Sequence, residues 1–297
     1  MIKISIAHLA KRLFRLTMHA MTVLTLNAQL SNAHNTYISP AIPDGFGTDF
    51  HDSMSFLKRT AKGPQWDIFE RLYYTHVVEG HIQATPTIPK KIHQIWLGSP
   101  LPEKCKKLQK SWIEHHPDWE YKLWTDDDIE ALHLINKTAY DAATNYGAKS
   151  DIARYEILYR FGGLYIDTDF ECLHSFDVLH HMLDFYTGIM LKSSLFPINN
   201  ALIGSKPLHP ILEKCIAAII VEDVVKTDPN FSSGPCVISK EFIAYVDSCT
   251  DACVAFPAGY FYPWPPYHRE QNSPTQIQQW IRPETFAVHH WHVSWMK

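Results

Sequence analysis

The sequence lacks an excess of positive charge, cysteine pairs of the zinc-binding kind, and internal repeats. Its 27 lysine and arginine residues face 31 acidic ones, which gives a formal net charge of −4, so the chain has no bulk attraction for nucleic acid. Its six cysteines include no CxxC pair and no other zinc-type spacing. Their even number permits disulfides without requiring them. These absences argue against a nucleic-acid-binding protein and against a zinc-stapled domain.

The sequence also lacks a long uninterrupted apolar run. Residues 16–33, LTMHAMTVLTLNAQLSNA, are uncharged and moderately apolar, but histidine, asparagine and glutamine interrupt them, whereas a membrane span needs about 20 mostly apolar residues. Basic residues precede this stretch at Lys3, Lys11, Arg12 and Arg15. We interpret residues 1–33 as a signal peptide or short membrane anchor, with an amphipathic or disordered leader as the alternative. The expected location is the secretory pathway, membrane-associated or exported, and a cytoplasmic location stays open.

What the sequence does contain is an alternation of strand and helix patterns from residue 88 onward. IPKKIHQIWLGSP indicates a strand and a turn, and EKCKKLQKSWIEHHPDW indicates a helix that ends before Pro117. Such alternation predicts an α/β domain, layered α/β/α, with a mainly parallel sheet over residues 88–297. Residues 34–87 mix proline, glycine and histidine with short helical patches. We interpret them as a lead-in packed on the main domain.

Three consecutive acids, Asp126 to Asp128, follow a predicted strand over 121–124 and the predicted N-cap Thr125. They suggest a metal site. Acids are, however, favoured in the first turn of a helix, where they offset its dipole. We therefore interpret them as a helix start.

The most informative stretch is SDIARYEILYRFGGLYIDTDF, residues 150–170. Ser150 is the predicted cap of a helix that the double glycine at 162–163 ends. An apolar strand follows and carries Asp167 and Asp169, which strand alternation places on one face. Buried acids are costly unless a positive charge meets them. Two carboxylates at the end of a strand suit Mg²⁺ or Mn²⁺, which fills its remaining positions with water and substrate phosphates.

The helix before this strand supplies a complementary pair. Asp151 and Arg154 are three residues apart and share one helix face. The plain alternative is a surface ion pair, which contributes little to stability. The order of helix, double glycine, strand and acids favours instead an arginine that reaches a phosphate or sugar oxygen, for which its planar fork is suited.

The string KSDIARYEILYRFGGLYIDTD resembles the signature of glycosyltransferases with a DXD-containing sugar-binding region, glycosyltransferase family 32. The resemblance extends through IPKKIHQIWLG, YKLWTDDD, NALIGSKPLHP, SSGP, FYP and HHWHVSW, and so covers residues 88–297. It implies a GT-A fold, a bound Mn²⁺ or Mg²⁺, and a nucleotide-diphosphate sugar such as GDP-mannose or a UDP-hexose as donor. It further implies transfer, with retention of configuration, to a hydroxyl of a lipid headgroup, glycan or protein.

The resemblance also implies roles for single residues. These are base stacking for Trp96, donor-sugar contacts for Asp151 and Arg154, a ribose or sugar contact and a share of the metal site for Asp167, direct metal ligation for Asp169, the border of the sugar pocket for Asn200 and Gly234, and closure over the diphosphate for Ser294 and Trp295. His289 or His290 completes the metal shell, and the sequence does not choose between them. Both are equally interpretable as core histidines of an aromatic strand.

No enzymatic nucleophile is evident, so attack by the acceptor hydroxyl on the face that the diphosphate leaves is our working hypothesis. The alternatives are a haloacid-dehalogenase-type phosphatase that uses the DxD, and a catalytically silent protein that binds sugar nucleotides. The phosphatase carries its nucleophilic aspartate on the first strand, whereas here a strand-bearing region from Ile92 precedes the motif. A glycosidase is less favoured, since its acids normally come from separate elements. Tyr262 and Trp264, in FPAGYFYPWPPYH, are expected to line the acceptor side.

Overall fold

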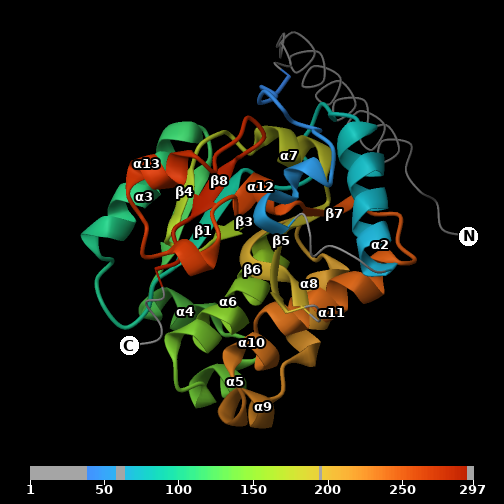
Figure 1. The fold of residues 1–297 in the computed structure, drawn as a ribbon. Coiled ribbons are helices and arrows are strands. Elements are labelled where there is room, and N and C mark those ends of the chain that lie inside the picture. Colours follow the sequence, from blue (N-terminus) through green and yellow to red (C-terminus); the bar gives the residue numbers. More distant parts are fainter. Residues whose placement is uncertain (1–38, 58–63, 194–195, 293–297) are drawn as a thin grey trace, which may run out of the picture. The chain divides into compact units, whose positions relative to one another are not determined.

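The computed structural model describes residues 39–57, 64–193 and 196–292 (Figure 1). The signal peptide or anchor predicted for residues 1–33 lies outside the described residues. From residue 40 onward the chain forms one compact unit. No helix within the described ranges is both long and apolar enough to cross a bilayer.

The centre of this unit is a six-stranded sheet. Its strands lie in the order β2 (Glu120–Trp124), β1 (Lys91–Ile95), β3 (Gly163–Ile166), β6 (Phe196–Ser205), β5 (Phe185–Ser193) and β7 (Cys253–Phe256). Strand β1 pairs in parallel with β2 and β3, and β5 pairs in parallel with β7, whereas β6 runs antiparallel to both of its neighbours. Five of the six strands therefore share one direction, which confirms the prediction of a mainly parallel sheet.

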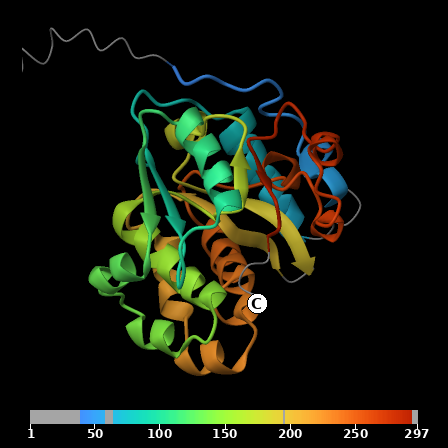
Figure 2. The ribbon, with the colours of Figure 1, turned by 90° about the vertical axis from the view of Figure 1, so that its left-hand side faces the viewer.

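Helices cover both faces of this sheet. They and the shorter helical turns are η1 (Asp52–Leu57), α2 (Pro64–Tyr73), η2 (Tyr74–Val78), α3 (Glu103–His115), α4 (Asp126–Leu132), α5 (Lys137–Ala142), α6 (Tyr146–Phe161), α7 (Asp177–Met182), α8 (Pro210–Ala218), α9 (Val221–Lys226), α10 (Pro229–Ser232), α11 (Pro235–Val246), α12 (Ala258–Phe261), η3 (Pro266–His268) and α13 (Pro274–Gln278). Helices α6, α8 and α11 gather on one side of the sheet (Figures 1 and 2). Side chains of β1 show that α3 lies on the other. The His93 ring lies within hydrogen-bond distance of the carbonyl of Gly162, which follows α6. The side chain of the next residue, Gln94, is hydrogen-bonded to Tyr121, which in turn is bonded to Gln109 of α3. Successive strand residues point to opposite faces, so α6 and α3 lie on opposite sides.

The lead-in segment shares the core of the domain. Helix α2 packs against β7, and the Tyr73 hydroxyl lies 2.7 Å from that of Tyr260. The same Tyr73 hydroxyl donates to the Thr48 carbonyl at 2.6 Å. Within the described part of the lead-in, Thr48 and helix α2 are thus joined to the domain by packing and by hydrogen bonds.

Helix α6 begins earlier than the sequence predicted. Its N-cap is Asn145, whose side-chain oxygen accepts from the Ala148 N–H at 2.8 Å. The prediction that Ser150 caps this helix is wrong, because an asparagine one turn upstream offers an equally good cap. The predicted end is correct: Gly162 and Gly163 have φ values of 61° and 101°, and a Cβ on Gly163 would lie 2.7 Å from the Lys91 carbonyl oxygen.

The strand predicted to run through the two acids is interrupted there, and neither acid lies in a strand. Strand β3 ends at Ile166, and β4 (Phe170–Cys172) belongs to a separate antiparallel sheet with β8 (Ala287–His289). In between, the Phe170 N–H donates to the Asp167 carbonyl at 3.3 Å and closes a turn. Asp167 and Asp169 therefore lie close together because of a turn, and not through strand alternation.

The three acids at the start of α4 behave as a helix start. Thr125 and Asp128 form a capping box, with the Thr125 N–H donating to the Asp128 carboxylate at 3.0 Å. Asp126 accepts from the Gly98 N–H at 2.7 Å. The prediction of a helix start at these acids is confirmed.

Candidate active site

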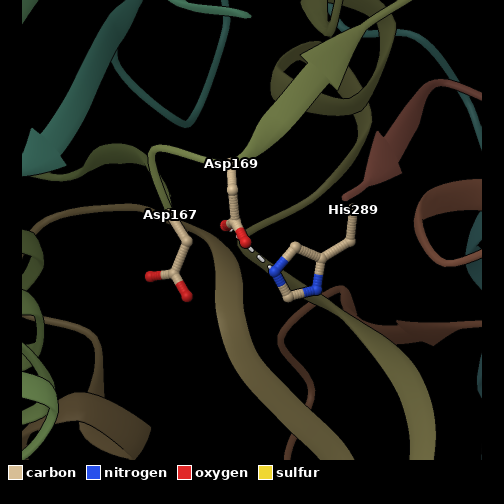
Figure 3. Close-up of side chains that lie close together, drawn as sticks. All are labelled: Asp167, Asp169 and His289. Carbon is tan, nitrogen blue, oxygen red and sulfur yellow. Dashed lines mark hydrogen bonds and ion pairs between the residues drawn. The ribbon is translucent and has the colours of Figure 1, made fainter. Parts of the chain in front are cut away.

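Asp167, Asp169 and His289 meet where the β3–β4 turn approaches β8 (Figure 3). The ladder between β4 and β8 pairs Phe170 with His289, and the His290 N–H donates to the Asp169 carbonyl at 2.9 Å. One ligand atom from each of the three side chains lies within 4.8 Å of the others. Residues 120 positions apart in the chain are thus brought to one point by a short strand pair.

Asp169 is held as a carboxylate. Its Oδ1 lies 3.0 Å from His289 Nε2, and its Oδ2 accepts from the His292 N–H at 2.7 Å. Burial by itself would raise the pKa of Asp169, but the charge and hydrogen bond of His289 and the His292 N–H lower it to about 2. Asp169 therefore stays ionised at any working pH.

Asp167 is in a different electrostatic position. Tyr165 donates its hydroxyl proton to Asp167 Oδ1 at 2.7 Å, and Arg154 Nη1 lies 3.3 Å from the same oxygen. Burial raises the pKa of Asp167, Arg154 opposes this, and the neighbouring charge of Asp169 raises it further. Like charges on adjacent carboxylates repel each other, and a cation between them would relieve that repulsion.

The donor set of this cluster fits a divalent cation of the Mg²⁺ or Mn²⁺ kind. Carboxylate oxygens are the ligands such ions prefer, and an imidazole nitrogen is tolerated by Mn²⁺. The His289 Nε2 is the ring nitrogen beside Asp169, and the buried Nδ1 has no hydrogen-bond partner among the described residues. Within the described ranges no second group of three such side chains gathers in this way.

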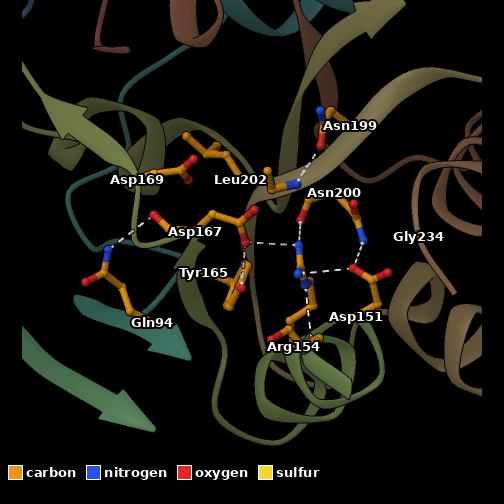
Figure 4. A network of polar contacts seen from close by, with 12 residues as sticks. Gln94, Asp151, Arg154, Tyr165, Asp167, Asp169, Asn199, Asn200, Leu202 and Gly234 are labelled. Carbon is orange, nitrogen blue, oxygen red and sulfur yellow. Dashed lines mark hydrogen bonds and ion pairs between the residues drawn. The ribbon is translucent and has the colours of Figure 1, made fainter. Parts of the chain in front are cut away.

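Arg154 joins the acidic turn to helix α6 (Figure 4). Its Nη2 lies 3.1 Å from Asp151 Oδ1, and its Nη1 donates to the Asn200 carbonyl at 2.7 Å. Its guanidinium carbon lies 4.4 Å from the ring centre of Tyr165. The side chains of Arg154 and Asp151 are only 5% and 11% exposed, so the alternative of a surface ion pair is wrong.

Asp151 is enclosed by residues from three segments. Asn200 Nδ2 donates to its Oδ1 at 2.7 Å, and Ser233 Oγ donates to its Oδ2 at 3.1 Å. Burial raises the pKa of Asp151 to about 6 even though Arg154 and the Asn200 hydrogen bond oppose the shift. A Cβ on Gly234 would lie 3.0 Å from Asp151 Oδ2. The structure thus brings Asn200 and Gly234 to the Asp151 carboxylate.

His290 does not join the acids. Its Nε2 lies 2.9 Å from Glu171 Oε2, because successive residues of a strand point to opposite sides. Of the two histidines that the sequence left open, His289 is the one that the structure places beside Asp169.

Trp96 lies at the edge of the sheet where the acidic turn is found. It follows β1 directly, and the parallel neighbour β3 ends just before Asp167. The Trp96 N–H donates to the Trp124 carbonyl at 3.0 Å, and its indole N–H donates to Ser99 Oγ at 3.1 Å. The remaining two predicted site residues, Ser294 and Trp295, lie outside the described residues.

The prediction that Tyr262 and Trp264 line the acceptor side is wrong. Their side chains are 0% and 1% exposed, so neither offers a surface to an acceptor. The Tyr262 ring instead meets the His289 ring edge-on, with centroids 5.8 Å apart, and stacks on Trp291. Tyr262 therefore packs against the imidazole of His289 within the core.

Two residues of the site were not predicted from the sequence. Tyr165 precedes Asp167 by two positions, a spacing that already places two strand side chains on one face, and this signal was available. Ser233 reaches Asp151 from a loop 82 residues away, and no local pattern indicates that contact.

Comparison with known proteins agrees with this geometry. Residues 102–186 match the model of the family described as glycosyltransferase sugar-binding region containing DXD motif. Inositol phosphoceramide mannosyltransferase 3 of Schizosaccharomyces pombe is 36% identical over 143 residues, which are 47% of this chain and 38% of that protein. Mannosyl phosphorylinositol ceramide synthase SUR1 of Saccharomyces cerevisiae is 33% identical over 139 residues, 44% of this chain and 35% of that protein. The chain thus spans less than half the length of these relatives.

Among solved structures, the PaToxG glycosyltransferase superposes with a TM-score of 0.50 at 19% identity, over 64% of this chain and 80% of that one. The likeness concerns the fold, and it confirms the predicted GT-A class. The family match covers Asp151, Arg154, Asp167 and Asp169 but ends before Asn200. Residues 102–186 therefore match the sugar-binding region containing a DXD motif that is described for glycosyltransferases, the resemblance that the sequence predicted.

Proposed function

We propose that this protein is a metal-dependent glycosyltransferase that moves a hexose from a nucleotide-diphosphate sugar to a hydroxyl group. The observation that carries the proposal is the arrangement of Asp167, Asp169 and His289 within 4.8 Å, joined through Arg154 to Asp151 inside the family region. The alternative of a phosphatase has no support from the family match. A catalytically silent binding protein is the outcome to test against.

The donor is proposed to be GDP-mannose or a UDP-hexose, with GDP-mannose first, because relatives 36% and 33% identical to this chain are named mannosyltransferases. Those names also mention inositol phosphoceramide. We therefore place a lipid headgroup first among acceptors, ahead of a glycan or a protein. With such an acceptor, the matching location of the enzyme is a membrane of the secretory pathway.

Asp167, Asp169 and His289 are the residues that would hold the cation. A bound Mn²⁺ or Mg²⁺ supplies positive charge beside the diphosphate as the C1–O bond breaks. Trp96, at the same sheet edge, is proposed to stack on the base. Ser294 and Trp295 are proposed to close over the diphosphate.

Arg154 has an organising role in this scheme. Its Nε donates to the Ser150 carbonyl, and its two terminal nitrogens serve Asn200, Asp167 and Asp151. A guanidinium has five N–H donors, so these contacts leave roughly one for the donor sugar or phosphate. The main role of Arg154 is thus to hold the carboxylates of Asp151 and Asp167 in place, and its lesser role is to contribute positive charge near the departing phosphate.

Asp151 is proposed to accept hydrogen bonds from hydroxyls of the donor sugar. Its two oxygens are already aligned by Asn200 and Ser233, so little reorganisation is needed on binding. Asp167 and Asp169 are both proposed to hold the cation and Asp151 to bind the sugar, so none of these three carboxylates is left to act as a nucleophile. Retention is therefore proposed to proceed by attack of the acceptor hydroxyl on the face that the diphosphate leaves.

A thermal-shift screen tests the class of reaction. UDP, GDP and their sugars are each added with and without Mn²⁺, and we expect a stabilisation for one base that needs the metal. Hydrolysis or transfer of the matching sugar then separates an enzyme from a silent binding protein. The absence of any metal-dependent shift would contradict the proposal.

A further inference from the structure

The main chain of Asp167 is held from three directions while its side chain enters the site. The Asp167 N–H donates to the Ala201 carbonyl on β6 at 2.8 Å. Its carbonyl accepts from the Phe170 N–H within the turn and from the side-chain amide Nε2 of Gln94, each at 3.3 Å (Figure 4). Gln94 thus links strand β1 to the acidic turn.

Gln94 stands where strand pairing ends. The register of β1 with β3 joins Ile92 to Leu164 and His93 to Tyr165, and it stops before Asp167. A main-chain carbonyl has two acceptor positions, and the amide of Gln94 fills the one that the Phe170 N–H leaves on Asp167. The Gln94 side chain is 0% exposed, a position where a polar group is costly unless both of its ends are hydrogen-bonded.

The other end of the amide is held by a directed chain of donors. The Tyr121 hydroxyl donates to Gln94 Oε1 at 2.5 Å, and Gln109 Nε2 donates to the Tyr121 hydroxyl at 2.6 Å. The Asp167 carbonyl can only accept, so the NH₂ group of Gln94 must face it. Every donor in the chain from Gln109 to Asp167 therefore points the same way, an arrangement in which hydrogen bonds strengthen one another.

Burial raises the pKa of Tyr121, so its hydroxyl keeps its proton and remains a donor. The chain crosses three elements: Gln109 is on α3, Tyr121 on β2 and Gln94 on β1. The register pairs Ile92 with Tyr121, and Gln94 lies two residues beyond Ile92 on the same face of the sheet. The crossover helix and two strands thus converge on one carbonyl of the turn.

We propose that Gln94 is a positioning residue, held by Tyr121 and Gln109, that fixes the main chain of the acidic turn so that Asp167 and Asp169 stay within reach of one cation. The inference rests on the proposed metal-dependent function. Gln94 acts through Asp167 and does not itself ligate the metal. An amide is required, because a glutamate of the same shape would set a carboxylate against a carbonyl oxygen.

The test compares four single variants as full-length proteins: Gln94→Met, Gln94→Glu, Tyr121→Phe and, as a matched control, Ser239→Ala. Ser239 is buried and bonds the main chain of Ile198, so its loss removes a comparable hydrogen bond away from the acidic turn. Mn²⁺ affinity is measured from the electron paramagnetic resonance signal of the free ion, with UDP or GDP present. The melting temperature without metal is measured in parallel, and KM and kcat follow for the active donor.

We expect Gln94→Met to weaken Mn²⁺ binding by roughly tenfold, a loss typical of removing a group that orients a metal ligand. Gln94→Glu should lose more Mn²⁺ affinity than Gln94→Met, and Tyr121→Phe should lose less. Ser239→Ala should lower the melting temperature and leave Mn²⁺ affinity unchanged. Tyr121→Phe decides the matter if Gln94→Met does not fold, since it removes one hydroxyl from a half-buried ring.

Wild-type Mn²⁺ affinity in Gln94→Met or Tyr121→Phe, together with a lower melting temperature, would mean that Gln94 merely stabilises the fold, and the inference would be wrong. That result is distinct from a failure of the proposed function. In the latter case the wild-type protein itself would bind no Mn²⁺ with either nucleotide diphosphate, which would overturn both.

Discussion

The imidazole of His289 stacks face to face on the ring of Phe170, with centroids 4.4 Å apart and planes 2° from parallel. The two residues are partners in the β4–β8 ladder, and Phe170 directly follows Asp169 in the chain. The stack therefore fixes the orientation of the ring that approaches the acid. A C-terminal histidine becomes part of the acidic turn through packing against an aromatic neighbour.

The two tail histidines should differ in their effect on metal binding. Replacing His289 by alanine should weaken Mn²⁺ affinity by more than about tenfold, the loss seen when even an indirect metal contact is removed. Replacing His290, which bonds Glu171, should leave that affinity close to wild type. Isothermal titration with Mn²⁺ in the presence of the nucleotide diphosphate measures both. Equal losses in the two variants would contradict the placement.

Asp169→Ala should abolish metal-dependent transfer or donor hydrolysis while the fold persists. Asp169 is proposed as a direct ligand, and its carboxylate is kept ionised by His289 and the His292 N–H. A turnover assay gives the activity, and circular dichroism checks the fold. Turnover at the wild-type rate in this variant would refute the assignment.

Arg154→Met should lower the free energy of unfolding by about 3–5 kcal/mol, because it leaves Asp151 and Asp167 without their buried cation. Adding Asp151→Asn to the same chain should restore part of the loss, since one of the two uncompensated charges is then removed. Urea unfolding of the wild type, the single and the double variant measures both steps. A double variant less stable than the Arg154→Met single variant would contradict the ion-pair account.

Asp151 should make stability depend on pH. Its pKa is about 6 in the folded protein against 3.8 ordinarily, so between these values the folded chain binds a proton that the unfolded chain releases. Stability contributed by this group is therefore lost as the pH rises from about 4 to 7, by on the order of 3 kcal/mol at most. Urea unfolding at pH 4.5 and 7.5 should show that the unfolding free energy of the wild type decreases, relative to that of Asp151→Asn, as the pH rises.

The titration of Asp151 should also change the affinity for the donor sugar nucleotide. Below about pH 6 the carboxyl of Asp151 takes up a proton and loses one of its acceptor positions. Donor affinity should then decrease in the wild type on acidification. A pH profile of the nucleotide-sugar Kd measures this.

The stability prediction has its own contradicting outcome. The raised pKa of Asp151 would be contradicted if the difference in unfolding free energy between the wild type and Asp151→Asn stayed constant, or grew in favour of the wild type, as the pH rises.

The sequence by itself determined the local elements and the residue types of the site. The capping pattern of Thr125, the double glycine after α6 and the acids that follow are short-range features, and short-range sterics and hydrogen bonding decide them. The alternation of strand and helix was enough to predict a mainly parallel α/β sheet.

Only the tertiary structure decided which distant side chains meet. His289 rather than His290 reaches Asp169 because the register of β4 with β8 sets which face each residue takes, and a shift of one residue would exchange them. The same holds for Tyr262 and Trp264, which the sequence predicted to line the acceptor side and which lie in the core, and for the turn that separates β3 from β4. The pairing of β4 with β8 brings together Asp169 and His289, which are 120 positions apart, and the burial of Tyr262 likewise depends on rings from other segments, so no local pattern carries that information.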